Sequence, residues 1–200
     1  GRYGLSSKNT NLNDIEAVYL NLKSKETKKR FTIGIIDDVT NLSLKRTDTK
    51  FKKDYEEILI YGYGSDGMIT TSKDILTIIG ENSDKYVQGY FEYDSKKSGG
   101  VTKSHLRFSD KEIKSTYYVE NPSVVICSKD SYINKFEMLS GIKDNGIFIL
   151  NTSSLKLSLP SSYLDIIKDK NIKVYTVNAS KIASDNNIPN KISMIMESVI

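Results

Sequence analysis

From about residue 54 onward, short apolar runs alternate with helical patterns, and this alternation limits the fold more than any other feature of the chain. Four short runs are predicted to be strands, the first of them buried. They are residues 58–61, 123–127, 146–150 and 173–177. Segments with apolar residues at helical spacing lie between or after them, at 66–79, 132–139, 162–168, 179–184 and 191–200. The alternation predicts a three-layer α/β/α fold with a mostly parallel sheet and helices on both faces.

A hairpin is expected inside this domain. Residues 86–93 and 101–108 both read as strands, and Ser98, Gly99 and Gly100 lie between them. Glycines at such a connection permit the tight turn of an antiparallel pair. The sheet is therefore predicted to be mixed, with most of its strands parallel.

The beginning of the chain shows a weaker pattern. Apolar residues at helical spacing predict a short helix at 13–22, and a compact apolar run predicts a strand at 31–36. Residues 45–53 are polar and are expected to form a loop. We therefore divide the chain into a lead-in segment at 1–53 and an α/β domain at 54–200.

Cysteine and histidine are each present once, as Cys127 and His105. An iron–sulfur cluster or a structural zinc ion needs about four donors, which are mostly Cys or His side chains. We therefore expect no metal centre in this chain. A single thiol forms no internal disulfide, which agrees with a reducing cytoplasm. Cys127 ends an apolar strand, and we interpret it as buried and inert.

The composition is that of a globular protein, with 38% hydrophobic and 27% charged residues. The net charge is +4 and the lysines are spread along the chain, so a solvated surface is favoured over nucleic-acid binding. No apolar run reaches about 18 residues, so we expect no membrane span. The chain opens without Met and stops inside an apolar helical pattern, so we expect a domain cut from a longer polypeptide.

Residues 62–67 match the pattern G-x-G-x-x-G between a strand and a helix. Glycines allow a tight turn there, and the N–H groups of a helix N-terminus attract anions. Asp66 argues against a nicotinamide dinucleotide, because its carboxylate can itself cap the helix and would face the pyrophosphate. Two other interpretations stay open: a purely structural turn, or a site for another phosphate-bearing ligand.

The turn of the hairpin is a second candidate site. Lys96 and Lys97 supply two cations there, while Ser98, Gly99 and Gly100 add a hydroxyl and exposed N–H groups. Such a set can hold a phosphate, but a solvated hairpin loop with ordinary lysines accounts for the same residues. Both interpretations stay open.

In open α/β sheets, ligands gather beyond the carboxyl ends of the parallel strands. Ser128 and Lys129 follow one predicted strand, and Asn151 and Thr152 follow the next. All four are polar and are compatible with a site at this edge of the sheet.

His105 and Arg107 alternate along one strand of the hairpin and therefore share a face. We interpret His105 as a hydrogen-bonded structural histidine, because the pattern places no nucleophile or carboxylate beside it. Arg107 is kept as a candidate ligand contact.

Several strings in this chain occur together in one known family. They are residues 34–40, 61–67, 86–100, 104–108, 151–152 and 194–196. In content and order they closely resemble the single-chain pyruvate:ferredoxin (flavodoxin) oxidoreductases, and the resemblance runs from residue 2 to residue 196. The lysine–lysine–serine–glycine–glycine string with the His-Leu-Arg downstream is specific to that family and its relatives.

The resemblance implies a large cytoplasmic homodimer that oxidatively decarboxylates pyruvate to acetyl-CoA. Such an enzyme uses thiamine diphosphate with magnesium, several iron–sulfur clusters, and coenzyme A as substrate, and it passes electrons to ferredoxin or flavodoxin. The cofactors lie in other domains of the same polypeptide, which are then the partners of this one. The present region resembles the third domain, equivalent to the separate γ subunit of multi-chain 2-oxoacid oxidoreductases.

The resemblance also assigns coenzyme A capture to this region. The residues expected to shape or contact that site are Gly62, Gly64, Ser65, Asp66, Gly67, Lys96, Lys97, Ser98, Gly99, Gly100, Arg107, Asn151 and Thr152. None of them is expected to be catalytic, and the region alone is expected to be inactive. The alternative is a non-catalytic module that fixes contacts between domains of the same enzyme.

Overall fold

The computed structural model describes residues 1–4, 6–36, 39–94, 100–154 and 156–200. The chain forms two compact units. The first contains residues 1–53 and 114–118, and the second contains residues 54–113 and 119–200.

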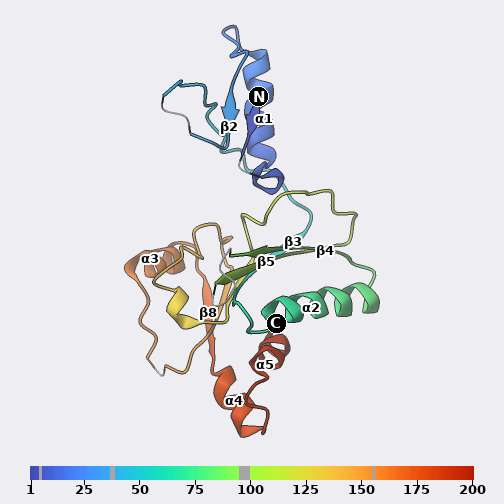
Figure 1. Cartoon of the computed structure of the whole chain (residues 1–200), viewed down its shortest axis with the longest axis vertical. Helices are drawn as coiled ribbons and strands as arrows, with labels where there is room; N and C mark the ends of the chain where they lie inside the picture. The colour runs from blue at the N-terminus through green and yellow to red at the C-terminus, as the bar shows by residue number, and fades with distance from the viewer. Residues whose placement is uncertain (5, 37–38, 95–99, 155) are drawn as a thin grey trace. The chain divides into compact units, whose positions relative to one another are not determined.

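A mixed sheet of six strands forms the centre of the second unit, in the order β4-β5-β3-β6-β7-β8. Figure 1 labels β3, β4, β5 and β8 of this sheet. Four of its strands run parallel: β3 (Glu56–Tyr63), β6 (Val124–Cys127), β7 (Ile147–Asn151) and β8 (Lys173–Val177). The predicted hairpin is confirmed as β4 (Tyr86–Tyr93) and β5 (Val101–Ser109), and β5 also pairs antiparallel with β3. The predicted α/β fold with a mostly parallel mixed sheet is therefore confirmed.

Three helices cover one face of this sheet. They are α2 (Met68–Asn82), α4 (Ala179–Asp185) and α5 (Ile192–Val199). Ile60 and Ile126 point to this face and share an apolar cluster with Met68, Ala179 and Met196, which come from these helices. Each of these side chains is buried.

The opposite face carries a second apolar cluster. Leu59 and Val125 belong to it, together with Leu139 and with Tyr163 of α3 (Ser161–Asp169). Neighbouring residues of one strand thus enter opposite clusters, as the two-residue period of a strand requires. Burial on both faces explains why these strands are continuous apolar runs in the sequence.

The helix predicted at 132–139 is wrong. A single 3-10 turn, η2 (Asp130–Tyr132), begins the segment, and further turns follow it. The hydroxyl of Tyr163 donates to the carbonyl of Phe136 at 2.5 Å and accepts from the N–H of Met138 at 3.1 Å. Because a distant side chain satisfies these backbone groups, they do not need a helix to do so.

The first unit contains the predicted helix, α1 (Leu12–Lys23), and the short elements β1 (Arg2–Tyr3), η1 (Ser7–Asn9) and β2 (Thr32–Ile33). Asn11 and Asp14 form a reciprocal capping box at the start of α1. Arg46 binds both carboxylate oxygens of Asp14, at 2.7 and 2.9 Å. The strand β2 is shorter than predicted, because the chain leaves the extended conformation at Gly34, where φ is +71°.

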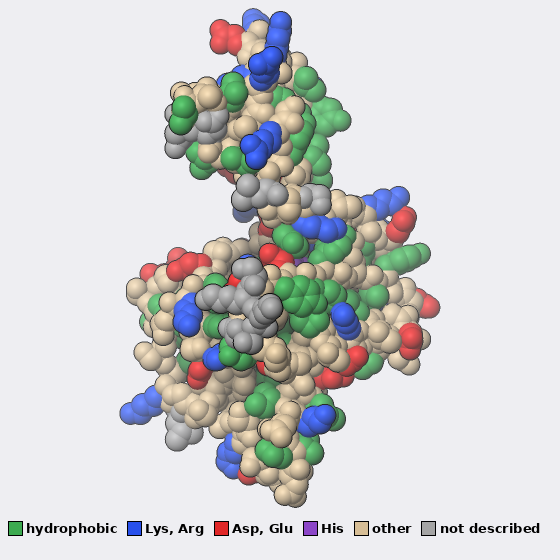
Figure 2. Space-filling view, in the orientation of Figure 1, with side chains coloured by type: hydrophobic (Ala, Val, Ile, Leu, Met, Phe, Trp, Pro, Cys, Tyr) green, Lys and Arg blue, Asp and Glu red, His purple; other side chains and the backbone are tan. Residues whose placement is uncertain are grey.

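The surface of the second unit mixes both signs of charge. Figure 2 shows Lys and Arg side chains interspersed with Asp and Glu on its visible face. Within the described residues, no helix combines the length and apolarity needed to cross a membrane. Over the same residues, no group of three His, Cys, Asp or Glu side chains is placed to hold a metal ion.

Candidate ligand-binding site

Two cavities lie beside the turn that follows β3, and the larger one is at the carboxyl ends of the parallel strands. Their volumes are about 450 and 300 Å³. Tyr63, Ser65 and Asp66 line both of them. The glycine-rich turn of residues 62–67 therefore forms the wall between two concave surfaces.

Glycine is needed at two positions of this turn. A Cβ on Gly62 would lie 2.6 Å from Oγ1 of Thr102, too close for a real contact. Gly67 has a φ of +85°, and a Cβ there would lie 2.7 Å from Oγ of Ser193. The helix α2 therefore begins at Met68, after the turn, and not at residue 66 as predicted.

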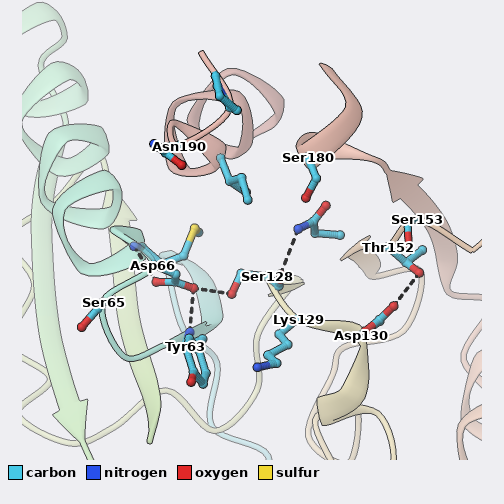
Figure 3. Close-up of a pocket in the computed structure, with 14 residues that line it drawn as sticks. Tyr63, Ser65, Asp66, Ser128, Lys129, Asp130, Thr152, Ser153, Ser180 and Asn190 are labelled. Atoms are coloured by element: carbon cyan, nitrogen blue, oxygen red, sulfur yellow. Dashed lines mark hydrogen bonds between the residues drawn. The ribbon is translucent and has the colours of Figure 1, made fainter. Parts of the chain in front are cut away.

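The carboxylate of Asp66 holds the turn together. Its Oδ2 accepts hydrogen bonds from the N–H of Tyr63 at 2.6 Å and the hydroxyl of Ser128 at 2.5 Å, and its Oδ1 accepts from the N–H of Met68 at 2.9 Å (Figure 3). Met68 is the first residue of α2, so the negative charge lies at the positive end of the helix dipole. The position at which this motif would bind a phosphate is thus taken by the protein's own carboxylate, as the sequence indicates.

The larger cavity lies at the ends of β3, β6 and β7. Figure 3 shows Tyr63, Ser128, Lys129, Thr152 and Ser180 around it. Among its described lining residues, Lys129 is the cation, and its Nζ lies 3.7 Å from the centroid of the Tyr63 ring. A ligand with a phosphate would meet an ammonium group and several hydroxyls here.

Asn151 and Thr152 connect the loops around this cavity. The side chain of Asn151 donates to the carbonyl of Ser128 and accepts from the N–H of Ala179, both at 3.0 Å. The hydroxyl of Thr152 donates to Asp130 at 2.8 Å. The polar groups of Asn151 and Thr152 are thus bonded to neighbouring loops, and we assign these two residues to the wall of the cavity.

The smaller cavity lies between the glycine-rich turn and the start of β5. Gly64, Asp94 and Gly100 line it, and the N–H of Gly64 donates to the carbonyl of Gly100 at 2.8 Å. The two predicted turns are therefore adjacent in space. The rest of the hairpin turn, with Lys96, Lys97, Ser98 and Gly99, lies outside the described residues, and its role stays a prediction.

Arg107 is not part of this site. In the β3–β5 ladder it lies opposite Glu57, whereas Thr102 lies opposite Gly62 at the cavity. Five residues of strand separate the two positions, or roughly 17 Å. The guanidinium is fully buried and donates to Glu57 at 3.0 Å and to Gln88 at 2.9 Å. We therefore correct its predicted role: Arg107 closes a buried ion pair in the sheet instead of meeting a ligand at the turn.

His105 has the structural role predicted for it. Its Nδ1 accepts from the N–H of Val119 at 3.1 Å, so the proton is on Nε2, which donates to Glu92 at 2.7 Å. This hydrogen bond is the main reason why the pKa of Glu92 lies below its ordinary value. The carboxylate of Glu92 thus faces His105, which the sequence pattern alone did not reveal.

Cys127 is buried, as predicted. Burial raises the pKa of its thiol to about 12, so the reactive thiolate is scarce at neutral pH. Its Sγ contacts the carbonyl of Lys129 at 3.1 Å. We therefore assign it to the core.

Sequence reasoning placed Lys129 at a strand end but missed its contact with Tyr63, because 66 residues of sequence separate them. It also missed Ser180 and Asn190, which reach the larger cavity from the helical end of the chain. Of these three residues, only Lys129 was recognisable from the sequence, because it follows a predicted strand.

Comparisons with known proteins identify the family and support the fold. The family model described as pyruvate ferredoxin/flavodoxin oxidoreductase matches residues 57–200. The pyruvate:ferredoxin oxidoreductase of Moorella thermoacetica is 41% identical over 204 residues, which cover 98% of this chain and 17% of that protein. This chain therefore spans about a sixth of the length of that relative.

Two solved structures have a similar fold. Pyruvate oxidoreductase subunit PORC from Thermotoga maritima has a TM-score of 0.52 at 24% identity, over 70% of this chain and 74% of that one. A 2-oxoglutarate:ferredoxin oxidoreductase from Magnetococcus marinus, solved with 2-oxoglutarate, coenzyme A and succinyl-CoA bound, has a TM-score of 0.54 at 14% identity. That match covers 72% of this chain and 23% of the other. The extent of the family match and the identity to the Moorella protein show that the chain belongs to the pyruvate ferredoxin/flavodoxin oxidoreductase family.

Proposed function

We propose that this chain is the γ-like domain of a pyruvate:ferredoxin (flavodoxin) oxidoreductase and that it docks coenzyme A. In this proposal the full protein converts pyruvate to acetyl-CoA and passes the electrons to ferredoxin or flavodoxin. It acts as a cytoplasmic homodimer, and its other domains hold thiamine diphosphate, magnesium and the iron–sulfur clusters. The name of the Moorella relative supports the reaction.

The residues of this chain do not fit a cluster. Cys127 is the one cysteine of the sequence, and a cluster needs about four thiolate ligands. Its thiol is also buried in the sheet. A role in holding a reactant is therefore more consistent with the chain than a role in electron transfer.

The polar cavity at the carboxyl ends of β3, β6 and β7 is the observation that carries the docking role. Its volume of about 450 Å³ falls in the range of small-molecule sites. Hydroxyls from Ser153 and Ser180 and the ammonium group of Lys129 line it. These groups match the needs of a nucleotide with phosphates, and a structural relative is described with coenzyme A bound.

The charges suggest where the phosphates lie. Asp66 places a negative charge at the turn, so a phosphate is disfavoured beside it. Lys129 is the cation among the described lining residues of the larger cavity, and its Nζ lies over the ring of Tyr63. Lys129, with the predicted contribution of Lys96 and Lys97, is therefore our candidate for the phosphate contacts.

The test is the KM for coenzyme A in the full-length enzyme. We expect Lys129→Ala to raise it about tenfold, because one charge-assisted hydrogen bond to phosphate is lost. Lys96→Ala combined with Lys97→Ala is expected to raise it as well. Pyruvate-dependent reduction of an artificial acceptor should stay unchanged in both variants. Lys135→Ala is the control, because that lysine is exposed a few residues further along the same segment.

The alternative is an assembly module without a ligand of its own. It predicts that none of the three lysine changes alters the KM for coenzyme A. It also predicts that the full-length enzyme loses its subunit or domain contacts when the surface of this chain is altered. An unchanged KM in every lysine variant would therefore favour this alternative over docking.

A further inference from the structure

Tyr132 is firmly anchored in the core of the second unit. Its ring packs edge-on against Phe136, with centroids 5.2 Å apart at 89°. Its N–H donates to the carbonyl of Lys129, and its own carbonyl accepts from the N–H groups of Lys135 and Phe136, each at 3.0 Å. The residue is 5% exposed. The ring and the backbone of Tyr132 are thus held by the contacts above, which leave its hydroxyl without a role.

The hydroxyl of Tyr132 is buried and has no hydrogen-bond partner among the described residues. Leaving such a group unsatisfied is unfavourable, and proteins contain few examples. Tyr163, in the same apolar cluster, shows the usual arrangement, because its hydroxyl both donates and accepts. The difference between these two tyrosines points to a partner for Tyr132 from outside the described residues.

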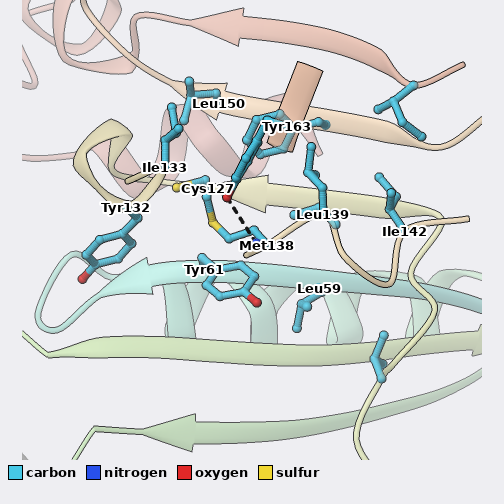
Figure 4. Packing of buried hydrophobic residues seen from close by; sticks show 14 residues of the cluster. Leu59, Tyr61, Cys127, Tyr132, Ile133, Met138, Leu139, Ile142, Leu150 and Tyr163 are labelled. Carbon is cyan, nitrogen blue, oxygen red and sulfur yellow. Dashed lines mark hydrogen bonds between the residues drawn. The ribbon is translucent and has the colours of Figure 1, made fainter. Parts of the chain in front are cut away.

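This hydroxyl lies behind the wall of the candidate site, because Tyr132 lines neither cavity but shares a cluster with Tyr63, which lines both. Figure 4 shows it turned away from Leu139 and Ile142, at the carboxyl end of β3. Tyr63, which lines both cavities, packs against the cluster that contains Tyr132. Burial raises the pKa of Tyr132, and the nearby carboxylates of Asp66 and Asp94 raise it further. Asp94 also lines the smaller cavity.

The surroundings determine what kind of group fits. The phenol is neutral and can donate a hydrogen bond. The carboxylates of Asp66 and Asp94 disfavour an anion beside it, so a phosphate is a poor match. An uncharged acceptor, such as an amide carbonyl, meets both conditions.

We propose that the Tyr132 hydroxyl binds an amide carbonyl in the pantetheine arm of coenzyme A, an inference that rests on the docking function proposed above. Because the hydroxyl is covered in this structure, the arm reaches it only when neighbouring side chains move aside. The nucleotide and its phosphates stay in the part of the site near Lys129. Tyr132 thereby distinguishes a ligand with the amide arm from a bare nucleotide.

The test compares two ligands in the full-length enzyme by calorimetry. One is coenzyme A, and the other is adenosine 3′,5′-bisphosphate, which has the nucleotide but lacks the arm. Tyr132→Phe is expected to raise the Kd of coenzyme A about three- to tenfold, the effect of one neutral hydrogen bond. The Kd of the bisphosphate should stay unchanged. Hydrogen exchange at the amides of β6 should be no faster than in the wild type, because no internal hydrogen bond is lost.

Tyr163→Phe is the matched control, a loss of the same hydroxyl from the same cluster. It should speed exchange at Met138 about fivefold or more and change the Kd of coenzyme A less than twofold. If wild-type enzyme binds no coenzyme A, the docking function fails together with this inference. If the wild type binds it and Tyr132→Phe binds it equally well, the role of Tyr132 alone is refuted. Faster exchange in Tyr132→Phe, or an equal rise in the Kd of both ligands, would also refute it.

Discussion

Replacing Asp66 by alanine removes three hydrogen bonds at once from the turn between β3 and α2. Two of them come from backbone N–H groups, of Tyr63 and Met68, and the third from the hydroxyl of Ser128. A hydrogen bond to a charged group contributes about 1.5–3 kcal/mol, and a side chain that caps a helix about 1 kcal/mol. Because these contributions share one carboxylate and do not add, we expect a total loss of about 2–4 kcal/mol.

Asp66→Asn should be less destabilising than Asp66→Ala. Its amide keeps one oxygen, which can accept either from Met68 or from the pair of Tyr63 and Ser128, while its NH₂ group faces the donors that remain. We therefore expect a loss of about 1–2 kcal/mol. Asp74→Asn serves as the control, because this carboxylate is exposed on the same helix.

The measurement is equilibrium unfolding in urea, followed by circular dichroism and tyrosine fluorescence, since the chain contains no tryptophan. The expected order of stability is wild type and Asp74→Asn, then Asp66→Asn, then Asp66→Ala. If Asp66→Ala unfolds at the same urea concentration as Asp74→Asn, the carboxylate does not hold the turn, and the reasoning is refuted.

Two further predictions concern the ion pair of Glu57 with Arg107 and the hydrogen bond of Glu92 with His105. Glu57→Ala leaves the guanidinium of Arg107 buried without its carboxylate, so the free energy of unfolding should fall by about 3–5 kcal/mol; a loss under about 1 kcal/mol in urea would contradict this. The hydrogen bond from His105 lowers the pKa of Glu92 from 4.5, so its contribution to stability is present above pH 4.5 and is lost as the pH falls below that value. The stability difference between wild type and Glu92→Gln should therefore shrink on acidification from pH 6 to pH 3, and a constant difference in urea unfolding would rule this out.

The sequence predicted the parts of the fold that local patterns control. The apolar runs at β3, β6 and β7 identified strands of a mostly parallel sheet with helices on both faces, because a strand covered on each side is apolar along its whole length. The glycines and Asp66 likewise predicted the tight turn and its internal carboxylate, since all of the interacting groups except Ser128 lie within a few residues. When hydrogen-bond partners are neighbours in sequence, the spacing of the residues is enough to predict the contact.

The errors involve partners that are distant in sequence. The segment 132–139 has helical spacing, yet its backbone groups bond to the hydroxyl of Tyr163, which follows 25 residues after Met138. Arg107 shares a strand face with His105 and was predicted to contact a ligand, but Glu57 occupies the facing position on β3. Spacing along one strand does not reveal which residue the register places opposite.

The turn after β3 also shows why a glycine pattern alone does not define a ligand. Its glycines meet a real steric need, as the contacts expected for a Cβ on Gly62 and Gly67 show. The anion-binding end of α2, however, is already neutralised by Asp66. A phosphate ligand therefore has to find its cation elsewhere, and in the described part of the larger cavity that cation is Lys129. The Asp66 carboxylate also disfavours a phosphate near the Tyr132 hydroxyl, whereas an uncharged group is tolerated there. In the proposed complex, this one side chain would therefore keep the phosphates of the ligand apart from its neutral arm.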